Sequence, residues 1–166
     1  MGQKSVKEDK NIYHQLRENR GLSRAAASEL LQCISESRLI RIEIDGNLPY
    51  PEEIKAMSEA YKEPGLCNYY CSQDCPLGQY YVPKVKVKDL SVITLEMLSL
   101  LNQLNKQKER LIEITVDGKI DRDEINDFKK IRSDLEKMSM TIDSMQLWIE
   151  NSIAAGEMDE KILEQN

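Results

Sequence analysis

Three cysteines lie close together in the chain, and their spacing could let them bind a metal ion. Cys67, Cys71 and Cys75 are four residues apart, and positions four apart share one face of a helix. Three thiolates could therefore converge on one ion, and a structural zinc site needs a fourth ligand. Cys33 and His14, the single histidine, are the candidates for that ligand. The cluster predicts a zinc site, with an iron–sulfur cluster as the alternative for soft ligands.

The same cysteines have a second interpretation, as reduced side chains that pack like small hydrophobic residues around Tyr69 and Tyr70. Stable disulfides are mainly a feature of secreted proteins. Residues 1–10 are charged rather than apolar, and no run of about 18 apolar residues occurs, so we expect neither a signal peptide nor a membrane span. We therefore expect a cytoplasmic protein whose cysteines are either reduced or bound to metal.

An acidic turn over residues 113–124 is the other candidate for ion binding. It has the glycine, the isoleucine and the final glutamate of an EF-hand loop, but it begins with Glu113 and lacks an acidic third ligand. We expect poor calcium affinity and a tight turn in which Asp121 caps the next helix. The sequence has no Gly-rich phosphate loop and no G-x-S-x-G motif, and it offers one histidine as a base, so we expect no enzyme activity.

The composition favours an all-α fold. Aromatic residues make up 5% of the 166 residues, while leucine, isoleucine, glutamate and lysine are abundant, as in packed amphipathic helices. The net charge of −6 argues against a protein that coats nucleic acid without regard to sequence. Residues 1–63 carry ten Lys/Arg and eleven Asp/Glu, a net charge of −1, and residues 64–166 carry thirteen and eighteen, a net charge of −5. The first part is therefore the better candidate for facing DNA.

Helix signals divide the first 65 residues into four short helices. The spacing predicts helices over residues 11–20 and 24–32, a third that begins after Ser35, and a fourth that opens at Pro51. Gly21 supplies a stop for the first helix. Residues 66–83 form a separate segment rich in cysteine and tyrosine, and residues 84–88 alternate lysine and valine as an extended linker.

Beyond residue 88, apolar residues repeat at intervals of three and four in two long segments joined by a polar turn at residues 116–119. We expect an antiparallel helical hairpin over residues 89–153. Its two apolar seams exceed what one pair of helices can bury, so we expect the hairpin to form a homodimer through its heptad face. The predicted organisation is a compact domain at 1–65, a cysteine-rich junction and linker at 66–88, and an oligomerisation or interaction module at 89–166.

The stretch Leu16–Ser23, LRENRGLS, together with the Arg41-Ile42-Glu43 run, resembles the lambda-repressor/Cro-like helix-turn-helix family over residues 11–63. The resemblance implies a compact DNA-binding domain of a transcriptional regulator, with Arg17 of the first helix paired to Glu43 of the third. A dimer would match two half-sites on DNA.

Carried over residue by residue, the resemblance also implies a DNA-facing set. Arg24 would lie near a phosphate at the start of the second helix, and the third helix would supply base or phosphate contacts from Ser35, Glu36, Ser37, Arg38 and Arg41. The chain departs from the family pattern in a longer span from Ser23 to Glu43 and in a loop at Asn47-Leu48 without basic residues. Few phosphate contacts predict weak affinity.

A non-enzymatic adaptor is the alternative to a DNA-binding regulator. In that case the repressor-like fold would dock a protein, and the C-terminal helices would form an interaction surface. The charge of the recognition face distinguishes the two: a basic face favours the regulator, and a neutral or acidic face favours the adaptor.

Overall fold

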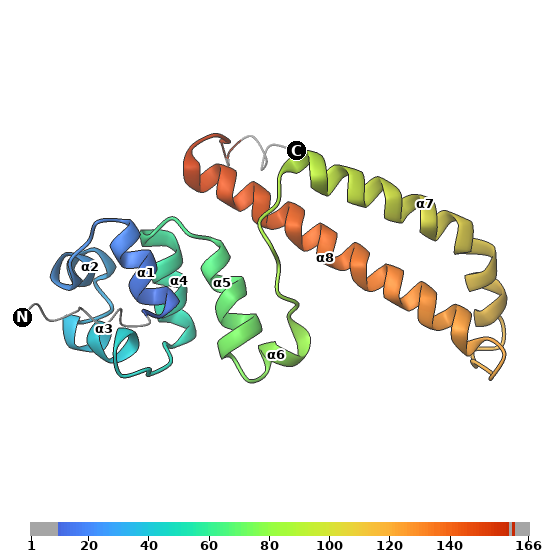
Figure 1. The fold of residues 1–166 in the computed structure, drawn as a ribbon, viewed down its shortest axis with the longest axis horizontal. Helices are drawn as coiled ribbons and strands as arrows, with labels where there is room; N and C mark the ends of the chain where they lie inside the picture. Colours follow the sequence, from blue (N-terminus) through green and yellow to red (C-terminus); the bar gives the residue numbers. More distant parts are fainter. Residues whose placement is uncertain (1–9, 160, 162–166) are drawn as a thin grey trace, which may run out of the picture. The chain divides into compact units, whose positions relative to one another are not determined.

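The computed structural model describes residues 10–159 and 161, and these residues contain helices and no strand. The predicted all-α class is confirmed. The chain divides into two compact units, Met1–Val82 and Pro83–Asn166, which are coloured from blue to green and from green to red in Figure 1. Unit 1 contains the helices α1 (Ile12–Asn19), α2 (Arg24–Leu31), α3 (Glu36–Glu43), α4 (Pro51–Ala60), α5 (Gly65–Tyr69) and α6 (Gly78–Tyr81), with a π-helical turn, η1, at Tyr70–Asp74.

Side-chain caps fix where the first three helices begin. The side chains of Asn11, Ser23 and Ser35 accept hydrogen bonds from backbone N–H groups in the first turns of α1, α2 and α3. Such caps satisfy donors that the helix itself leaves unpaired. Gly21, with φ of 68°, takes the left-handed conformation after α1 that favours glycine. The start positions therefore follow from the short polar residues that the sequence places before each helix.

The core of unit 1 is one cluster to which α1–α5 all contribute. Ala27, Leu39, Ile42, Met57 and Leu66 are almost completely inaccessible. Because Leu66 of α5 belongs to this cluster, the cysteine-rich segment is not a separate junction. The compact unit extends to Val82, past the boundary at residue 65 that the sequence pattern indicates.

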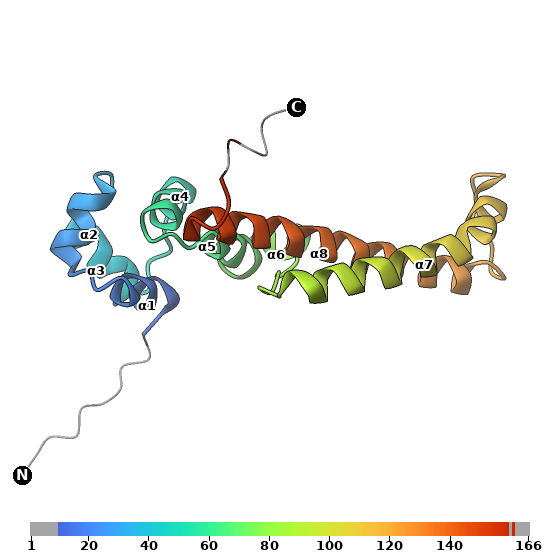
Figure 2. The same cartoon turned by 90° about the horizontal axis from the view of Figure 1, so that it is seen from above.

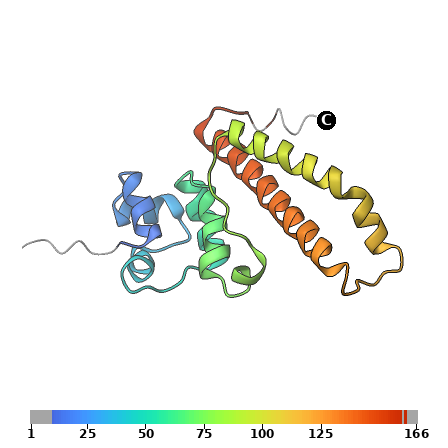
Figure 3. The ribbon, with the colours of Figure 1, turned by 45° about the vertical axis from the view of Figure 1, so that its right-hand side comes forward.

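Unit 2 is a helical hairpin of α7 (Leu90–Thr115) and α8 (Ile125–Ala155). The two helices lie side by side and run in opposite directions, as Figures 1 and 2 and the rotated view of Figure 3 show. Ile93, Leu100 and Ile114 of α7 and Ile131 of α8 are buried. Several polar residues of α8 are buried too, namely Asp134, Thr141, Ser144 and Ser152.

The two ends of the hairpin differ. At the turn between the helices, the Asp121 side chain accepts hydrogen bonds from the backbone N–H groups of Asp123 and Glu124, and α8 starts at the next residue, Ile125. Asp121 therefore caps the turn that leads into α8, while the N-cap residue of α8 itself is Glu124. At the other end, residues 83–89 form neither helix nor strand before α7 begins at Leu90. None of the described helices has the length and apolar character that a membrane crossing requires.

Candidate functional site

A buried ion cluster holds α1, α2 and α3 together. Arg17 donates from Nε and Nη2 to the two carboxylate oxygens of Glu43, at 2.7 and 2.8 Å, and Arg24 donates from Nε to Glu43 Oε2 at 2.9 Å. Arg17 also donates to the carbonyl of Leu22 at the start of the turn. Hydrogen bonding to Glu43 raises the pKa of Arg17 despite its burial. The expected Arg17–Glu43 pair is present, and together with Arg24 it links the three helices.

Arg24 keeps part of its guanidinium at the surface. Its side chain is 25% exposed, against 5% for Arg17. Within the described residues its side chain donates from Nε alone, so the terminal nitrogens keep donors for a further acceptor. The Glu43 carboxylate orients this arginine at the first residue of α2.

A second ion pair joins α3 to α4. Arg38 donates to both carboxylate oxygens of Glu53 at 2.8 Å and to the carbonyl of Leu48 at 3.0 Å, and its guanidinium lies 4.8 Å from the centroid of the Tyr50 ring. Burial acts to raise the pKa of Glu53, but the hydrogen bonds from Arg38 and from the Tyr50 backbone outweigh it and lower the pKa. Arg38, predicted from the resemblance as a DNA contact, has its charge engaged within the protein and its side chain only 14% exposed.

The other predicted contact residues of α3 form an exposed polar group. Ser35, Glu36, Ser37 and Arg41 are all exposed, whereas Leu39 and Ile42 turn inward to the core. The hydroxyls of Ser35 and Ser37 are 3.0 Å apart. The side of α3 that faces away from the core therefore carries hydrogen-bonding side chains.

The charge of this face is not basic. Besides Arg41, the exposed charged residues of α2, α3 and the following loop are Glu29, Glu36 and Asp45. Exposed apolar side chains lie in the same elements: Leu30 at 51%, Ile44 at 56% and Leu48 at 52%. The exposed charges of these elements sum to −2, or to −1 with the partly exposed Arg24, so charge alone does not add to the case for DNA.

The four cysteines do not form a metal site in the described part of the chain. No three His, Cys, Asp or Glu side chains there are arranged to hold an ion. Cys33 is exposed in the turn between α2 and α3, and Nε2 of His14 lies 3.0 Å from Glu18 Oε1. Burial, and then the neighbouring Cys75 and Cys67, raise the pKa of the Cys71 thiol. These three cysteines are near neighbours, as predicted, but Cys33 and His14 do not complete a set of ligands.

Aromatic packing and a hydrogen bond join the cysteine segment to the core of unit 1. The Tyr13 hydroxyl donates to Asp74, and the Tyr13 ring meets the Tyr69 ring edge to face at 6.4 Å. Burial, and then the bond to Asp74, raise the pKa of Tyr13. At the next turn, Gly78 packs so tightly that an added Cβ would lie 2.0 Å from the carbonyl oxygen of Cys71. The segment is a fixed part of unit 1.

Sequence reasoning missed two partners in these networks. Glu53 has a signal, because a glutamate three residues after Tyr50 at a Pro51 helix start is the pattern of a capping box. Asp74 has none, since its partner Tyr13 is 61 residues away in the chain.

Comparison of the chain with protein-family models, with curated proteins and with solved structures finds no match.

Proposed function

We propose that unit 1 is a helix-turn-helix DNA-binding domain of a transcriptional regulator, and that α3 reads the major groove. The observation that carries the proposal is the exposed polar group on α3, Ser35, Glu36, Ser37 and Arg41, held opposite a buried side by the Arg17–Glu43 pair. A recognition helix needs hydrogen-bonding side chains near its N-terminus, and arginine is the usual reader of guanine.

The ion pairs assign different roles to the arginines. The Arg41 guanidinium is exposed and makes no hydrogen bond within the described residues, so it can donate two hydrogen bonds to a base edge. Arg24 is held by Glu43 through Nε and keeps the donors of its terminal nitrogens, which suits a phosphate. Arg38 holds α3 to α4 through its ion pair with Glu53. Because few cations face the DNA, affinity rests on two copies binding two half-sites, and its salt dependence is shallow.

The test is a selection of bound sequences from random duplexes at low salt, followed by titrations of the selected site. Arg41→Ala should cost about 1–3 kcal/mol at that site and relax the sequence preference there, whereas Arg24→Ala should weaken all sequences alike and reduce the salt dependence. Lys119→Ala, which removes a positive charge at the hairpin turn, is the control and should leave binding unchanged. If Glu36 accepts a hydrogen bond from cytosine, Glu36→Gln should raise non-specific binding and lower discrimination.

Protein docking by the same face is the second candidate function. It is favoured by the exposed charges of α2, α3 and the following loop, which are three carboxylates and one arginine, and by the exposed Leu30, Ile44 and Leu48 of the same elements. Charged phosphates would be repelled by such a surface, while an amphipathic partner could bury its apolar side chains. A selection that recovers no enriched sequence from a folded, intact protein would move the protein to this adaptor class.

A further inference from the structure

Each helix of the hairpin carries an exposed apolar stripe that the other helix does not cover. On α7, Leu90, Leu101 and Ile112 recur every 11 residues, close to three helical turns, and are 39%, 51% and 55% exposed. On α8, Leu135 and Ile142 are 48% and 53% exposed, and the partly buried Phe128 and Ile149 extend the same interval of seven residues. Both stripes follow helical periodicity from end to end.

The two stripes lie on the same side of the hairpin. A groove of about 530 Å³ marks the opposite side, and Ser99 of α7 and Met140 of α8 line it. At about 100° per residue, Leu101 is turned about 200° from Ser99, and Ile142 is turned about 200° from Met140. The stripes therefore lie on one face of the hairpin, called the apolar face below. With Leu98 (53% exposed), its exposed apolar side chains have an area on the order of 500 Å², the size of a patch that often serves an interaction.

This apolar face is symmetric about its own middle. The α7 stripe is centred on Leu101, and the α8 stripe is centred between Leu135 and Ile142. The hydrogen bond from Gln107 to Asp134 sets the register of the two antiparallel helices, so Leu101 lies level with residue 140 of α8. The two centres agree to within about 3 Å along the hairpin. A two-fold axis through that point would place each stripe against the same stripe of a second copy, as an isologous contact requires.

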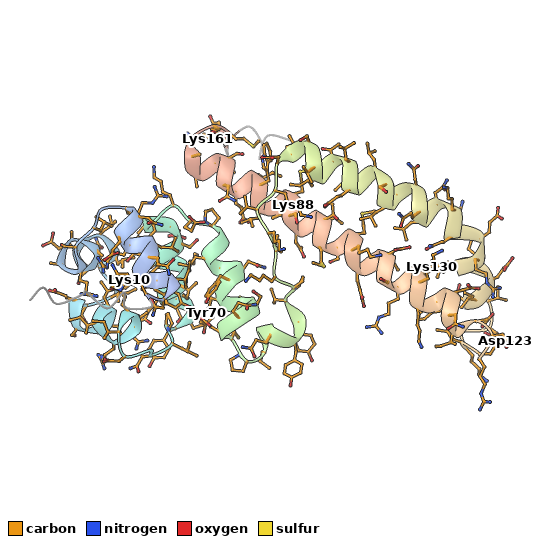
Figure 4. All side chains as sticks on the ribbon, viewed as in Figure 1. Lys10, Tyr70, Lys88, Asp123, Lys130 and Lys161 are labelled. Carbon is orange, nitrogen blue, oxygen red and sulfur yellow. The ribbon has the colours of Figure 1, made fainter. Side chains whose placement is uncertain are left out.

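The charges select one direction for such a contact. Residues 113–127, around the turn of the hairpin, carry six Asp/Glu and two Lys/Arg. Figure 4 shows Asp123 at this end and Lys88 at the other. Two hairpins packed in parallel would bring two acidic turns together, whereas an antiparallel pair separates them.

We propose that a second copy of this chain covers the apolar face, so that two hairpins pack antiparallel into a four-helix bundle with its two-fold axis near Leu101. The exposed patch accounts for most of the roughly 800 Å² that each partner buries in a standard interface. The inference holds for either candidate function of unit 1.

Sedimentation equilibrium of the full chain at 1–100 μM tests this proposal. The wild type should be a dimer. Leu101→Glu places two carboxylates near the two-fold axis, and Ile142→Glu adds a charge to the same face. Each variant should raise the dissociation constant of the dimer more than about tenfold. The matched controls Leu95→Glu (69% exposed) and Met140→Glu (44% exposed) change the groove side and should leave the dimer intact.

A photo-crosslinking residue defines the direction. At position 101 it should capture residues 98–105 of the second copy, and at position 90 it should capture residues near 112. A wild type that is monomeric with full helicity would overturn the proposal, as would a dimer broken by the groove-side variants alone. Capture of position 90 by position 90 would overturn the antiparallel arrangement.

Discussion

Arg38 of α3 and Glu53 of α4 form a two-pronged ion pair, with both nitrogen–oxygen distances at 2.8 Å. The pKa of Glu53 is lowered, so its carboxylate contributes stability above the ordinary glutamate pKa of about 4.3, and this contribution is lost as pH falls through the lower, folded value. Glu53→Gln should lower the free energy of unfolding by about 1–3 kcal/mol at pH 7 and reduce the further loss of stability at acidic pH. Urea unfolding between pH 2 and 7 measures both effects. If the variant lost as much stability at acidic pH as the wild type, this assignment would be wrong.

The Arg17–Glu43 pair predicts a larger loss. Both side chains are at most 5% exposed, so removing one charge leaves the other buried without its partner. Glu43→Gln should destabilise unit 1 by about 3–5 kcal/mol in urea unfolding. Arg132→Ala breaks the exposed pair with Glu136 and should change stability little. Equal effects of the two variants would show that the buried pair does not support the fold.

Replacing Tyr61 with phenylalanine should increase the stability of unit 1. The Tyr61 hydroxyl is buried and has no hydrogen-bond partner among the described residues, and burial raises its pKa to about 12. Tyr61→Phe should stabilise unit 1 by about 1 kcal/mol at pH 7, because the unpaired hydroxyl no longer has to leave water.

The raised pKa of Tyr61 also predicts a loss of folding stability at alkaline pH. Since its folded pKa is raised, its ionisation in the unfolded chain destabilises the protein as pH rises from about 10 to about 12. Chemical unfolding at pH 7 and 11 should show a larger benefit of Tyr61→Phe at pH 11. Tyr81→Phe, at an 82% exposed position, is the control and should show no such difference.

A substitution at Gly78 tests how tightly the cysteine segment is packed. Gly78→Ala would force a Cβ against the Cys71 carbonyl oxygen and should destabilise unit 1 by about 1–3 kcal/mol. Hydrogen exchange should rise in residues 66–82 of this variant. Leu77→Ala, which shortens a 72% exposed side chain, should change neither stability nor exchange. Unchanged exchange in the glycine variant would mean that the close contact does not hold the segment.

Local signals made most of the helices predictable. Asn11, Ser23, Ser35 and Pro51 mark helix starts through contacts within one turn, and periodicity of apolar residues reveals the hairpin. The attachment of residues 66–82 to the core was not predictable, because Leu66 and the Tyr13–Asp74 bond depend on residues distant in the sequence.

The candidate site was predictable in part for the same reason. Arg17 and Glu43 follow from the resemblance, and the exposure of Ser35, Glu36, Ser37 and Arg41 follows from helical spacing. The partners of Arg24 and Arg38 come from other helices, so the sequence does not reveal that their charges are partly or fully engaged. The fourth ligand expected from Cys33 or His14 is not found among the described residues, where Cys33 is exposed in a turn and His14 Nε2 lies 3.0 Å from Glu18 Oε1.

The length of α7 has a consequence for the spacing of the N-terminal units. At 1.5 Å per residue its 26 residues span about 39 Å, and residues 83–89 join it at one end. In an antiparallel pair of hairpins, the two chains would leave from opposite ends of the bundle. With the two-fold axis near Leu101, the two copies of Leu90 would lie about 22 residues, or about 33 Å, apart along the bundle. This separation is close to the 34–36 Å between successive major grooves on one side of a DNA duplex.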